Sequence, residues 1–332
     1  MRLHFRLLLL SLILLSSCIK DEFYNKKGNN IENFNLLWEI IDESYCYFDY
    51  KQIDWDSIYS IYRPQISNNL TKYDFFKICG NMLFELKDGH VKLSSDFNAM
   101  SYSDFYLGYP QNFNSTIIER TYLAKDYINA NKLKAKNIRG VGYIRYGSFM
   151  NMISSRNLKE AIIQLGDIKG LIIDVRDNTG GSIAMVDTIV SNFCKSDIIS
   201  GYVRNKTGKG HNDFTDYLPN KIKAKSEPVY DGNIVVLTNR LVYSAANDFV
   251  SAMKCLDNVT IIGDKTGGGG GAPFTSELYN GWQVKYSKIP LYDKDKQHIE
   301  FGIEPDIKID MDKEQEANGI DSIIEFAIDY LR

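Results

Sequence analysis

The spacing of apolar residues divides the chain into two regions. From Asn33 to about Ser95, apolar side chains recur at the spacing of one helical face. They form three groups: Phe34, Leu37, Trp38 and Ile41; Ile58, Ile61 and Tyr62; and Phe75, Phe76, Cys79, Met82 and Leu83. Asp54 and Thr71 precede the second and third groups and are candidate N-caps. The pattern predicts a small helical N-terminal region over residues 33–95.

A different pattern begins at about Gly140, where short apolar runs alternate with amphipathic stretches. The runs are 141–149, 171–175, 234–237 and 259–262, and the stretches are 158–165, 183–194, 245–256 and 320–331. Strands that alternate with helices in this way favour an α/β core, which we place at residues 96–332. Within it, the aromatic and turn-rich residues 96–139 predict β structure, and residues 201–228 predict polar surface loops.

The first 32 residues carry the features of an export signal and a tether. Residues 1–17 contain a basic start, an apolar run and small residues. The run is too short to cross a hydrocarbon core of about 30 Å, which disfavours a transmembrane anchor. Leu15-Ser16-Ser17-Cys18 resembles the bacterial lipobox, in which the cysteine is acylated and becomes the mature N-terminus. We therefore expect a lipoprotein signal peptide over 1–17, lipidation at Cys18, a polar tether over 18–32 and a place in the cell envelope, at the outer membrane.

Composition narrows the class of protein further. With 44% hydrophobic and 24% charged residues, the chain of 332 residues is typical of a folded globular protein. Its 39 basic and 42 acidic residues include no dense basic cluster, which argues against nucleic acid as a partner. The cysteines other than Cys18 lie in apolar stretches without zinc-ligand spacing, so buried free thiols are favoured over disulfides, and no metal site is predicted: Cys46, Cys79, Cys194 and Cys255.

One candidate functional segment joins a strand to a helix through two glycines. The apolar run 171–175 is followed by Arg176-Asp177-Asn178-Thr179-Gly180-Gly181 and a helical stretch that begins near Ile183. Such a junction presents free backbone N–H groups and suits an anionic oxygen. An ordinary turn between a strand and a helix has the same shape, so the segment alone does not decide between them.

A second segment places a serine at the start of a helix. The apolar run 234–237 is followed by a loop and by Ser244-Ala245-Ala246. The Ser244 hydroxyl and the Ala245 N–H would lie at the positive end of the helix dipole, so the site could supply a nucleophile and an oxyanion donor together. Serine is also a common N-cap, and no G-x-S-x-G surrounds Ser244, which argues against an α/β-hydrolase elbow.

Few histidines are available to act as a general base. The chain has four histidines, and His4 falls in the predicted signal, which leaves His90, His211 and His298. His211 lies in a polar, Gly-rich loop and is interpreted as a surface residue. His90 follows Asp88-Gly89 after the third predicted helix, where an imidazole can project into a cleft between two regions. A partly buried structural histidine is the alternative.

These segments together resemble a known family. Asp174-Val175-Arg176-Asp177-Asn178-Thr179-Gly180-Gly181, Ser244-Ala245-Ala246, Gly263-Asp264-Lys265-Thr266 and Gly302-Ile303-Glu304-Pro305-Asp306-Ile307 are similar, in this order, to motifs of the tail-specific, or C-terminal-processing, serine peptidases. The resemblance implies a ClpP/crotonase-like β/α peptidase core. It also implies Ser244 as the acyl-enzyme nucleophile, with an oxyanion hole formed by the N–H groups of Ala245 and of Gly180 or Gly181.

Departures from the family pattern indicate which branch the chain resembles. The Ser–Lys branch carries a Gly-Lys-Gly where this chain has Gly268-Gly269-Gly270, and Lys265 stands at the wrong offset to replace that lysine. Asp88-Gly89-His90 is instead similar to a motif of the tricorn-like Ser–His branch, which has Ser in place of Gly89. This resemblance implies His90 as the general base and Glu300 as the residue that orients it. Many members of this family carry a PDZ domain after the helical region, and residues 96–139 are too few to form one.

The resemblance implies a serine endopeptidase that hydrolyses peptide bonds of an unfolded or extended polypeptide without a metal or organic cofactor. The alternative is a non-catalytic binder of an apolar ligand, because retinoid-binding relatives share the fold. The presence of both Ser244 and His90 favours the enzyme. The physiological substrate, the membrane face and the oligomeric state stay open.

Overall fold

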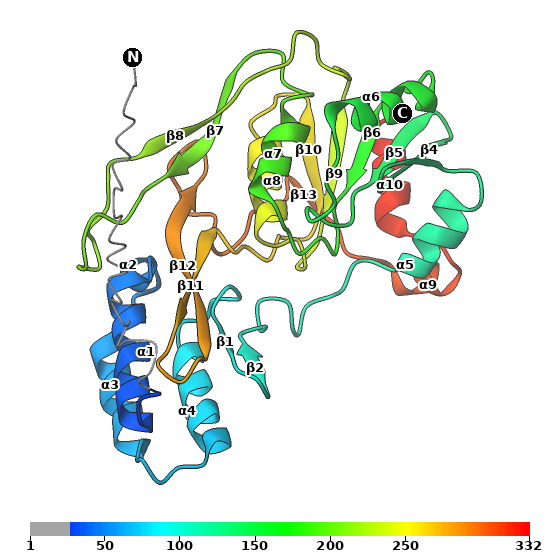
Figure 1. The fold of residues 1–332 in the computed structure, drawn as a ribbon. Helices are drawn as coiled ribbons and strands as arrows, with labels where there is room; N and C mark the ends of the chain where they lie inside the picture. The colour runs from blue at the N-terminus through cyan, green and yellow to red at the C-terminus, as the bar shows by residue number, and fades with distance from the viewer. Residues whose placement is uncertain (1–26) are drawn as a thin grey trace, which may run out of the picture.

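The computed structural model describes residues 27–332 and shows a mixed α/β protein. Figure 1 shows a group of N-terminal helices at one end and a β/α core at the other, with long strands between them. The predicted signal peptide and Cys18 lie outside the described residues. Within residues 27–332, no helix is both long and apolar enough to cross a membrane.

The N-terminal region is helical, as predicted. It contains α1 (Asn30–Ser44), α2 (Phe48–Lys51), α3 (Trp55–Tyr62), the 3₁₀ turn η2 (Arg63–Gln65) and α4 (Lys72–Phe84). The predicted N-caps are confirmed, because Asp54 accepts a hydrogen bond from the Ser57 N–H and Thr71 accepts one from the Asp74 N–H. Asn29 and Glu32 form a capping box that starts α1 at Asn30, so the helix begins inside the predicted tether.

The core is a seven-stranded sheet with helices on both faces. Its order is β13 (Ile307–Lys308), β10 (Val259–Gly263), β9 (Ile234–Thr238), β6 (Leu171–Asp174), β5 (Val141–Arg145), β4 (Leu133–Ile138) and β3 (Ile128–Ala130). The strands from β13 to β5 are parallel, and β4 and β3 continue the sheet antiparallel. This confirms the predicted α/β core.

Alternate strand residues bury opposite faces of this sheet, as the period of a strand requires. Ile173 and Val236 contact a hydrophobic cluster that includes α6 (Ser155–Leu165), α7 (Ile183–Val190) and α8 (Ala245–Met253). Ile172 and Val235 contact a cluster on the other face, which includes α10 (Ser322–Tyr330) and the π-helical turn η3 (Ile118–Leu123). Two short helices, α5 (Ser115–Ile117) and α9 (Lys313–Ala317), complete this side.

A second sheet ties the helical region to the core. It runs β2 (Ala99–Ser101), β1 (Lys92–Ser94), β12 (Gln283–Tyr292), β7 (Ile198–Val203) and β8 (Leu218–Ile222), and β11 (Gly271–Glu277) also pairs with β12. Trp282 and Val284 are buried in the same hydrophobic cluster as Phe75 and Phe76 of α4. The helical region therefore shares its core with a hairpin from the C-terminal half of the chain.

Two sequence predictions were wrong in part. Residues 96–139 contain the predicted strands but also α5 and η3, where Ile117, Ile118 and Tyr122 turn one buried face towards the core. Residues 201–228 form the β7–β8 ladder rather than only loops. The strand β8 was hidden because Leu218 at its start is exposed and only Ile222 at its end is buried, which leaves no run of apolar residues.

A buried charge network closes the C-terminal end of β6. Arg176 is fully buried and forms ion pairs with Asp174 at 2.7 Å and with Asp321 at 3.0 Å. Asp321 is also the N-cap of α10, and Asp174 accepts a hydrogen bond from the Tyr143 hydroxyl at 2.8 Å. Removing one partner of a buried ion pair costs about 3–5 kcal/mol, so this network fixes the loop that follows β6.

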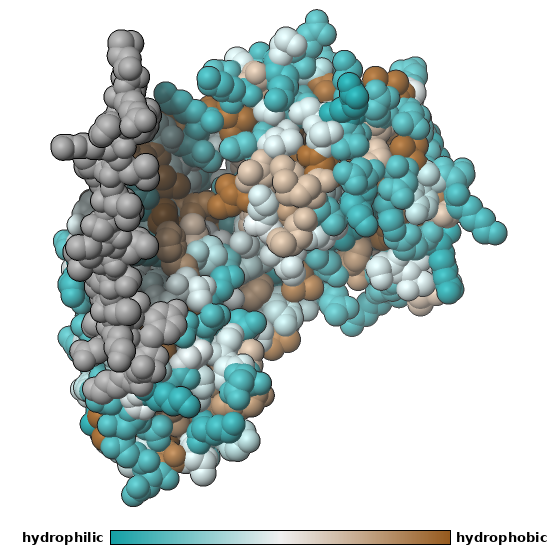
Figure 2. Space-filling view, viewed as in Figure 1, coloured by the Kyte–Doolittle hydropathy of each residue, from teal (hydrophilic) through white to brown (hydrophobic). Residues whose placement is uncertain are grey.

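The remaining surface and the cysteines agree with a folded globular protein. Figure 2 shows a mostly hydrophilic face, with scattered hydrophobic side chains over the core and a more hydrophobic recess beside it. Cys46, Cys79, Cys194 and Cys255 are free thiols as predicted, and all but Cys255, which is half-buried, are buried.

Candidate active site

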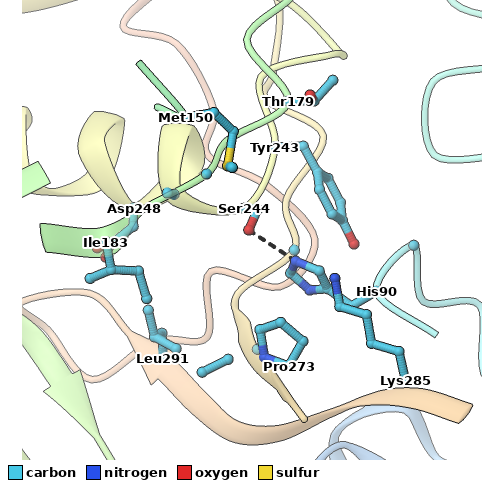
Figure 3. Close-up of a pocket in the computed structure, with 16 residues that line it drawn as sticks. His90, Met150, Thr179, Ile183, Tyr243, Ser244, Asp248, Pro273, Lys285 and Leu291 are labelled. Carbon is cyan, nitrogen blue, oxygen red and sulfur yellow. Dashed lines mark hydrogen bonds between the residues drawn. The ribbon is translucent and has the colours of Figure 1, made fainter. Parts of the chain in front are cut away.

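Ser244 and His90 meet at a cavity between the N-terminal region and the core. The Ser244 Oγ lies 2.9 Å from the His90 Nε2, although the two residues are 154 positions apart in the chain (Figure 3). Ser244 precedes α8, yet its side chain does not form an N-cap hydrogen bond. The structure therefore excludes a simple capping role for this serine.

The backbone of Ser244 is strained and held by three neighbouring loops. Its φ is 58° and its ψ is −127°, a conformation that a serine adopts only at a cost of about 1–3 kcal/mol. The Ser244 N–H donates to the Gly268 carbonyl at 2.9 Å, and the Tyr243 N–H donates to the Asn178 carbonyl at 3.1 Å. A Cβ atom on Gly180 would lie 2.8 Å from the Ser244 Cβ, so only glycine fits at that position.

Two of the three predicted oxyanion donors are free. In residues 27–332, the N–H groups of Gly181 and Ala245 have no hydrogen-bond acceptor, and both residues line the cavity beside Ser244. The Gly180 N–H donates to the Asn178 Oδ1 at 3.0 Å. The sequence named Gly180 or Gly181 as the second donor, and this geometry leaves Gly181 together with Ala245.

His90 is buried and held in its neutral form. Burial lowers the pKa of His90 to about 4; Asp88 opposes this shift, whereas Lys285 and Lys51 add to it. The Asp88 Oδ1 accepts the backbone N–H of His90 at 2.8 Å, which fixes the turn that presents the ring. A neutral imidazole whose Nε2 faces a serine hydroxyl can accept its proton.

The glycine that departs from the family motif has a local explanation. A Cβ on Gly89 would lie 2.7 Å from the Phe105 Cε1 and 2.8 Å from the Tyr243 Oη. The Tyr243 ring also packs against the His90 ring, with centroids 5.0 Å apart. Tyr243 and Phe105 therefore occupy the space that a serine side chain would need at position 89.

Glu300 does not make the contact that the sequence predicted. Its Oε1 pairs with the Lys51 Nζ at 2.6 Å, and its Oε2 accepts the Gly270 N–H at 2.9 Å. The His90 Nδ1 is buried and has no hydrogen-bond partner among the described residues. The expected Glu300–imidazole hydrogen bond is thus replaced by an ion pair with Lys51, because that cation lies between Glu300 and Asp88.

The charges around Lys51 are strongly coupled. Burial and the nearby Asp88 raise the pKa of Glu300 to about 8, although Lys51 opposes the shift. Burial alone would raise the pKa of Asp88, but Lys51 and His90 hold it below its usual value. Asp88 is therefore the ionised carboxylate that acts on His90, and Glu300 is the one that holds a proton more readily.

The cavity itself has a volume of about 380 Å³ and a mixed lining. His90 and Lys285 lie on one side of Ser244, and Asp248, Ile183 and Leu291 lie on the other (Figure 3). The glycine run contributes Gly269 and Gly271 to its wall. This lining carries ionisable side chains at both ends, which does not match a pocket built for a purely apolar ligand.

The other candidate residues lie elsewhere. Lys265 pairs with Glu304 at 2.9 Å, and His211 pairs with Asp42 at 2.8 Å. His298 packs among aromatic rings, 3.9 Å from the Tyr50 centroid. Across residues 27–332, no group of three or more His, Cys, Asp and Glu side chains is arranged to hold a metal ion.

Three residues of the site were missed by the sequence analysis. Lys51 and Tyr243 carry no spacing signal that links them to His90. Asp248 did carry one, because it lies in the first turn of the helix that directly follows Ser244.

The fold and the site together define a class. A serine at a helix N-terminus, hydrogen-bonded to a neutral histidine and flanked by free N–H groups, is the arrangement of serine hydrolases. Residues 140–309 match the model of peptidase family S41, and residues 29–84 match that of the Tricorn protease C1 domain.

Two solved structures are similar to this chain over most of its length. A solved structure from Parabacteroides merdae ATCC 43184, described provisionally as a peptidase, is 43% identical with a TM-score of 0.88, over 92% of this chain and 97% of that one. Mature CPAF in complex with lactacystin shares the fold at 11% identity, with a TM-score of 0.71, over 92% of this chain and 97% of that one.

Curated relatives of this chain are also named as serine proteases. A Staphylococcus aureus (strain COL) protein named as a CtpA-like serine protease is 28% identical over 209 residues, which is 62% of this chain and 40% of that protein. The chain thus spans about 40% of the length of the staphylococcal relatives that it matches. The chain belongs to peptidase family S41, which confirms the predicted family.

Gly180→Ala is expected to disrupt Ser244 without unfolding the protein. The new Cβ would press on Ser244 and on the Ala245 N–H, and a displacement of about 1 Å at a reacting group costs on the order of 10²-fold in rate. The measurement is the rate at which a fluorophosphonate probe labels Ser244. Gly140→Ala is the matched control, because Gly140 also has a positive φ but no atom within 4 Å of a built Cβ. Equal labelling of both variants would contradict the packing argument.

Proposed function

We propose that this protein is a serine peptidase that cleaves polypeptides through an acyl-enzyme at Ser244. The observation that carries the proposal is the 2.9 Å hydrogen bond between the Ser244 Oγ and the His90 Nε2 at the edge of the cavity. Family membership and the names of the staphylococcal relatives support the peptide bond as the target.

In the acylation step, the His90 Nε2 takes the hydroxyl proton as the Ser244 Oγ attacks the peptide carbonyl carbon. The negative charge that develops on the carbonyl oxygen is stabilised by the N–H groups of Ala245 and Gly181. When the carbon–nitrogen bond breaks, the protonated His90 gives its proton to the leaving amine. Water then attacks the ester, with His90 again as the base, and releases the acyl product.

Asp88 acts as the positioning residue for His90. Its carboxylate fixes the backbone of His90 and raises the proton affinity of a ring that burial would otherwise weaken as a base. Lys51 balances the charge of Asp88 and holds Glu300 in place behind it. Glu300 in turn accepts the Gly270 N–H and so steadies the glycine wall of the cavity.

The non-catalytic alternative is less well supported. Binding of an apolar ligand does not require a strained serine beside a neutral histidine, and the ionisable side chains of Asp248 and Lys285 line the cavity.

We further propose that the protein is a lipoprotein of the cell envelope, anchored through Cys18 at the outer membrane. The support is the sequence alone: the basic start, the short apolar run and the lipobox-like Leu15-Ser16-Ser17-Cys18.

Ser244→Ala and His90→Ala are each expected to lower cleavage of an unfolded protein by roughly 10⁴-fold or more, because nucleophile and base act as a unit. Both variants should also lose fluorophosphonate labelling. Proteolysis is followed by gel and mass spectrometry, with His211→Ala as the control, since that histidine lies outside the cavity. Full activity in either active-site variant, or a folded wild type that neither labels nor cleaves, would reject the proposal.

The acid limit of activity should lie near pH 4 instead of near the ordinary histidine pKa of about 6.5. Only neutral His90 accepts a proton, so the rate falls as pH drops through its folded pKa. Asp88→Asn removes the main group that opposes this depression and should move the limit to lower pH, whereas Glu300→Gln should not. The measurement is kcat/KM against pH, with circular dichroism to confirm folding. An equal shift in Glu300→Gln would show that Glu300 acts on the imidazole.

Cys18→Ser is expected to abolish incorporation of labelled palmitate and to release the protein from the membrane fraction, because the acylated side chain is its attachment. Cys46→Ser is the control, since Cys46 is a free thiol in the folded region. Labelling that persists in Cys18→Ser would refute the anchor.

A further inference from the structure

The cavity beside Ser244 has an acidic end that the mechanism does not use. Asp248 lies in the first turn of α8 and lines the cavity on the side of Ser244 opposite to His90 (Figure 3). Its Oδ2 is buried and has no hydrogen-bond partner in the described part of the chain. No ion pair with Asp248 forms there either.

A second unpartnered carboxylate stands on the neighbouring helix. Asp187 belongs to α7, which packs against α8, and its Oδ1 is also buried without a partner among residues 27–332. No hydrogen bond joins the two carboxylates. Burial and the charge of Asp187 raise the pKa of Asp248 to about 7, so a negative charge on this carboxylate is costly.

The position of Asp248 in the first turn of its helix does not explain why its carboxylate is buried without a partner. An acidic residue in a first turn gains from the helix dipole, but that gain is about 0.3–1 kcal/mol at a solvated position and does not require burial. Burial makes the negative charge of this carboxylate costly, and a cation beside Asp248 in the cavity would offset that cost.

The direction of catalysis identifies which part of a substrate would reach Asp248. His90 must protonate the leaving amine, so the leaving group lies on the His90 side of Ser244. The acyl part then lies on the other side, beside Ile183, Leu291 and Asp248. Ile183 and Leu291 suit an aliphatic stem, and Asp248 suits a positive charge at its end, which is the chemistry of lysine and arginine side chains.

We propose that Asp248 makes this protein select substrates with lysine or arginine at P1, the residue on the acyl side of the cleaved bond. The inference rests on the proposed function, because it assigns the side-chain pocket of the same Ser244 site.

The test compares cleavage of matched peptides that carry lysine, arginine, norleucine or glutamate at P1. In the wild type, kcat/KM for lysine and arginine should exceed that for norleucine by at least roughly tenfold. Asp248→Asn should lower kcat/KM for the basic peptides roughly 10- to 100-fold and change norleucine cleavage little. Asp248→Lys should favour glutamate instead. Fluorophosphonate labelling should stay unchanged in Asp248→Asn, which shows that the Ser244 site is intact.

Asp56→Asn is the matched control, because Asp56 is an exposed acidic residue in the first turn of α3. Its peptide preference should equal that of the wild type. A wild type that cleaves but does not prefer basic P1 residues, or a preference that survives in Asp248→Asn, would overturn the inference and leave the peptidase proposal standing.

A binding measurement keeps the two proposals separable. In Ser244→Ala, which cannot turn over, the lysine peptide should bind at least roughly tenfold more tightly than the norleucine peptide, and the added Asp248→Asn should abolish the difference. Loss of cleavage and labelling in the wild type with this binding preference intact would reject the peptidase but not the pocket. Equal binding of both peptides would reject the pocket.

Discussion

The site depends on one backbone conformation, the positive φ of Ser244. A serine holds this conformation only where its surroundings impose it. Here the loops after β6, β9 and β10 meet at one edge of a parallel sheet. Gly180 packs against the Ser244 side chain, and the Gly268 carbonyl accepts a hydrogen bond from the Ser244 N–H. The same contacts leave the Ala245 N–H free beside the hydroxyl. The strain and the glycines on both sides are thus parts of one arrangement, which turns a residue in a common capping position into a half-buried nucleophile that faces the cavity.

The base comes from another part of the molecule, and its distance from Ser244 depends on how two regions join. His90 follows the N-terminal helices, whereas Ser244 belongs to the core. The strand β12 pairs with β1 near His90 and with β11 beside the cavity, and its Val284 and the preceding Trp282 are buried among the helices. Because the two regions share this hydrophobic core, the 2.9 Å contact is held by packing instead of by a flexible linker.

Burial sets the chemistry of the ionisable groups around the site. It lowers the pKa of His90 and raises the pKa values of Glu300 and Asp248, and in each case burial is the largest cause while neighbouring charges add to it or oppose it. Lys51 balances Asp88 and Glu300 on the side of the base. On the opposite side of Ser244, no described residue balances Asp248. The paired charges therefore lie on the side of the base, and the unpaired carboxylate lies on the side that we assign to the P1 side chain.

The sequence by itself determined the fold class, the family and the pair Ser244 and His90, because hydrophobic periods and ordered motifs are local patterns that survive in one dimension. It also placed the caps at Asp54 and Thr71. It missed the exposed strand β8, misplaced the start of α1 and assigned Glu300 to the imidazole. Only the tertiary structure decided that Lys51 captures Glu300, that Asn178 occupies the Gly180 N–H and that Asp248 reaches the cavity without a partner. Burial and the choice of partner belong to segments that meet only after folding, and no local pattern records them.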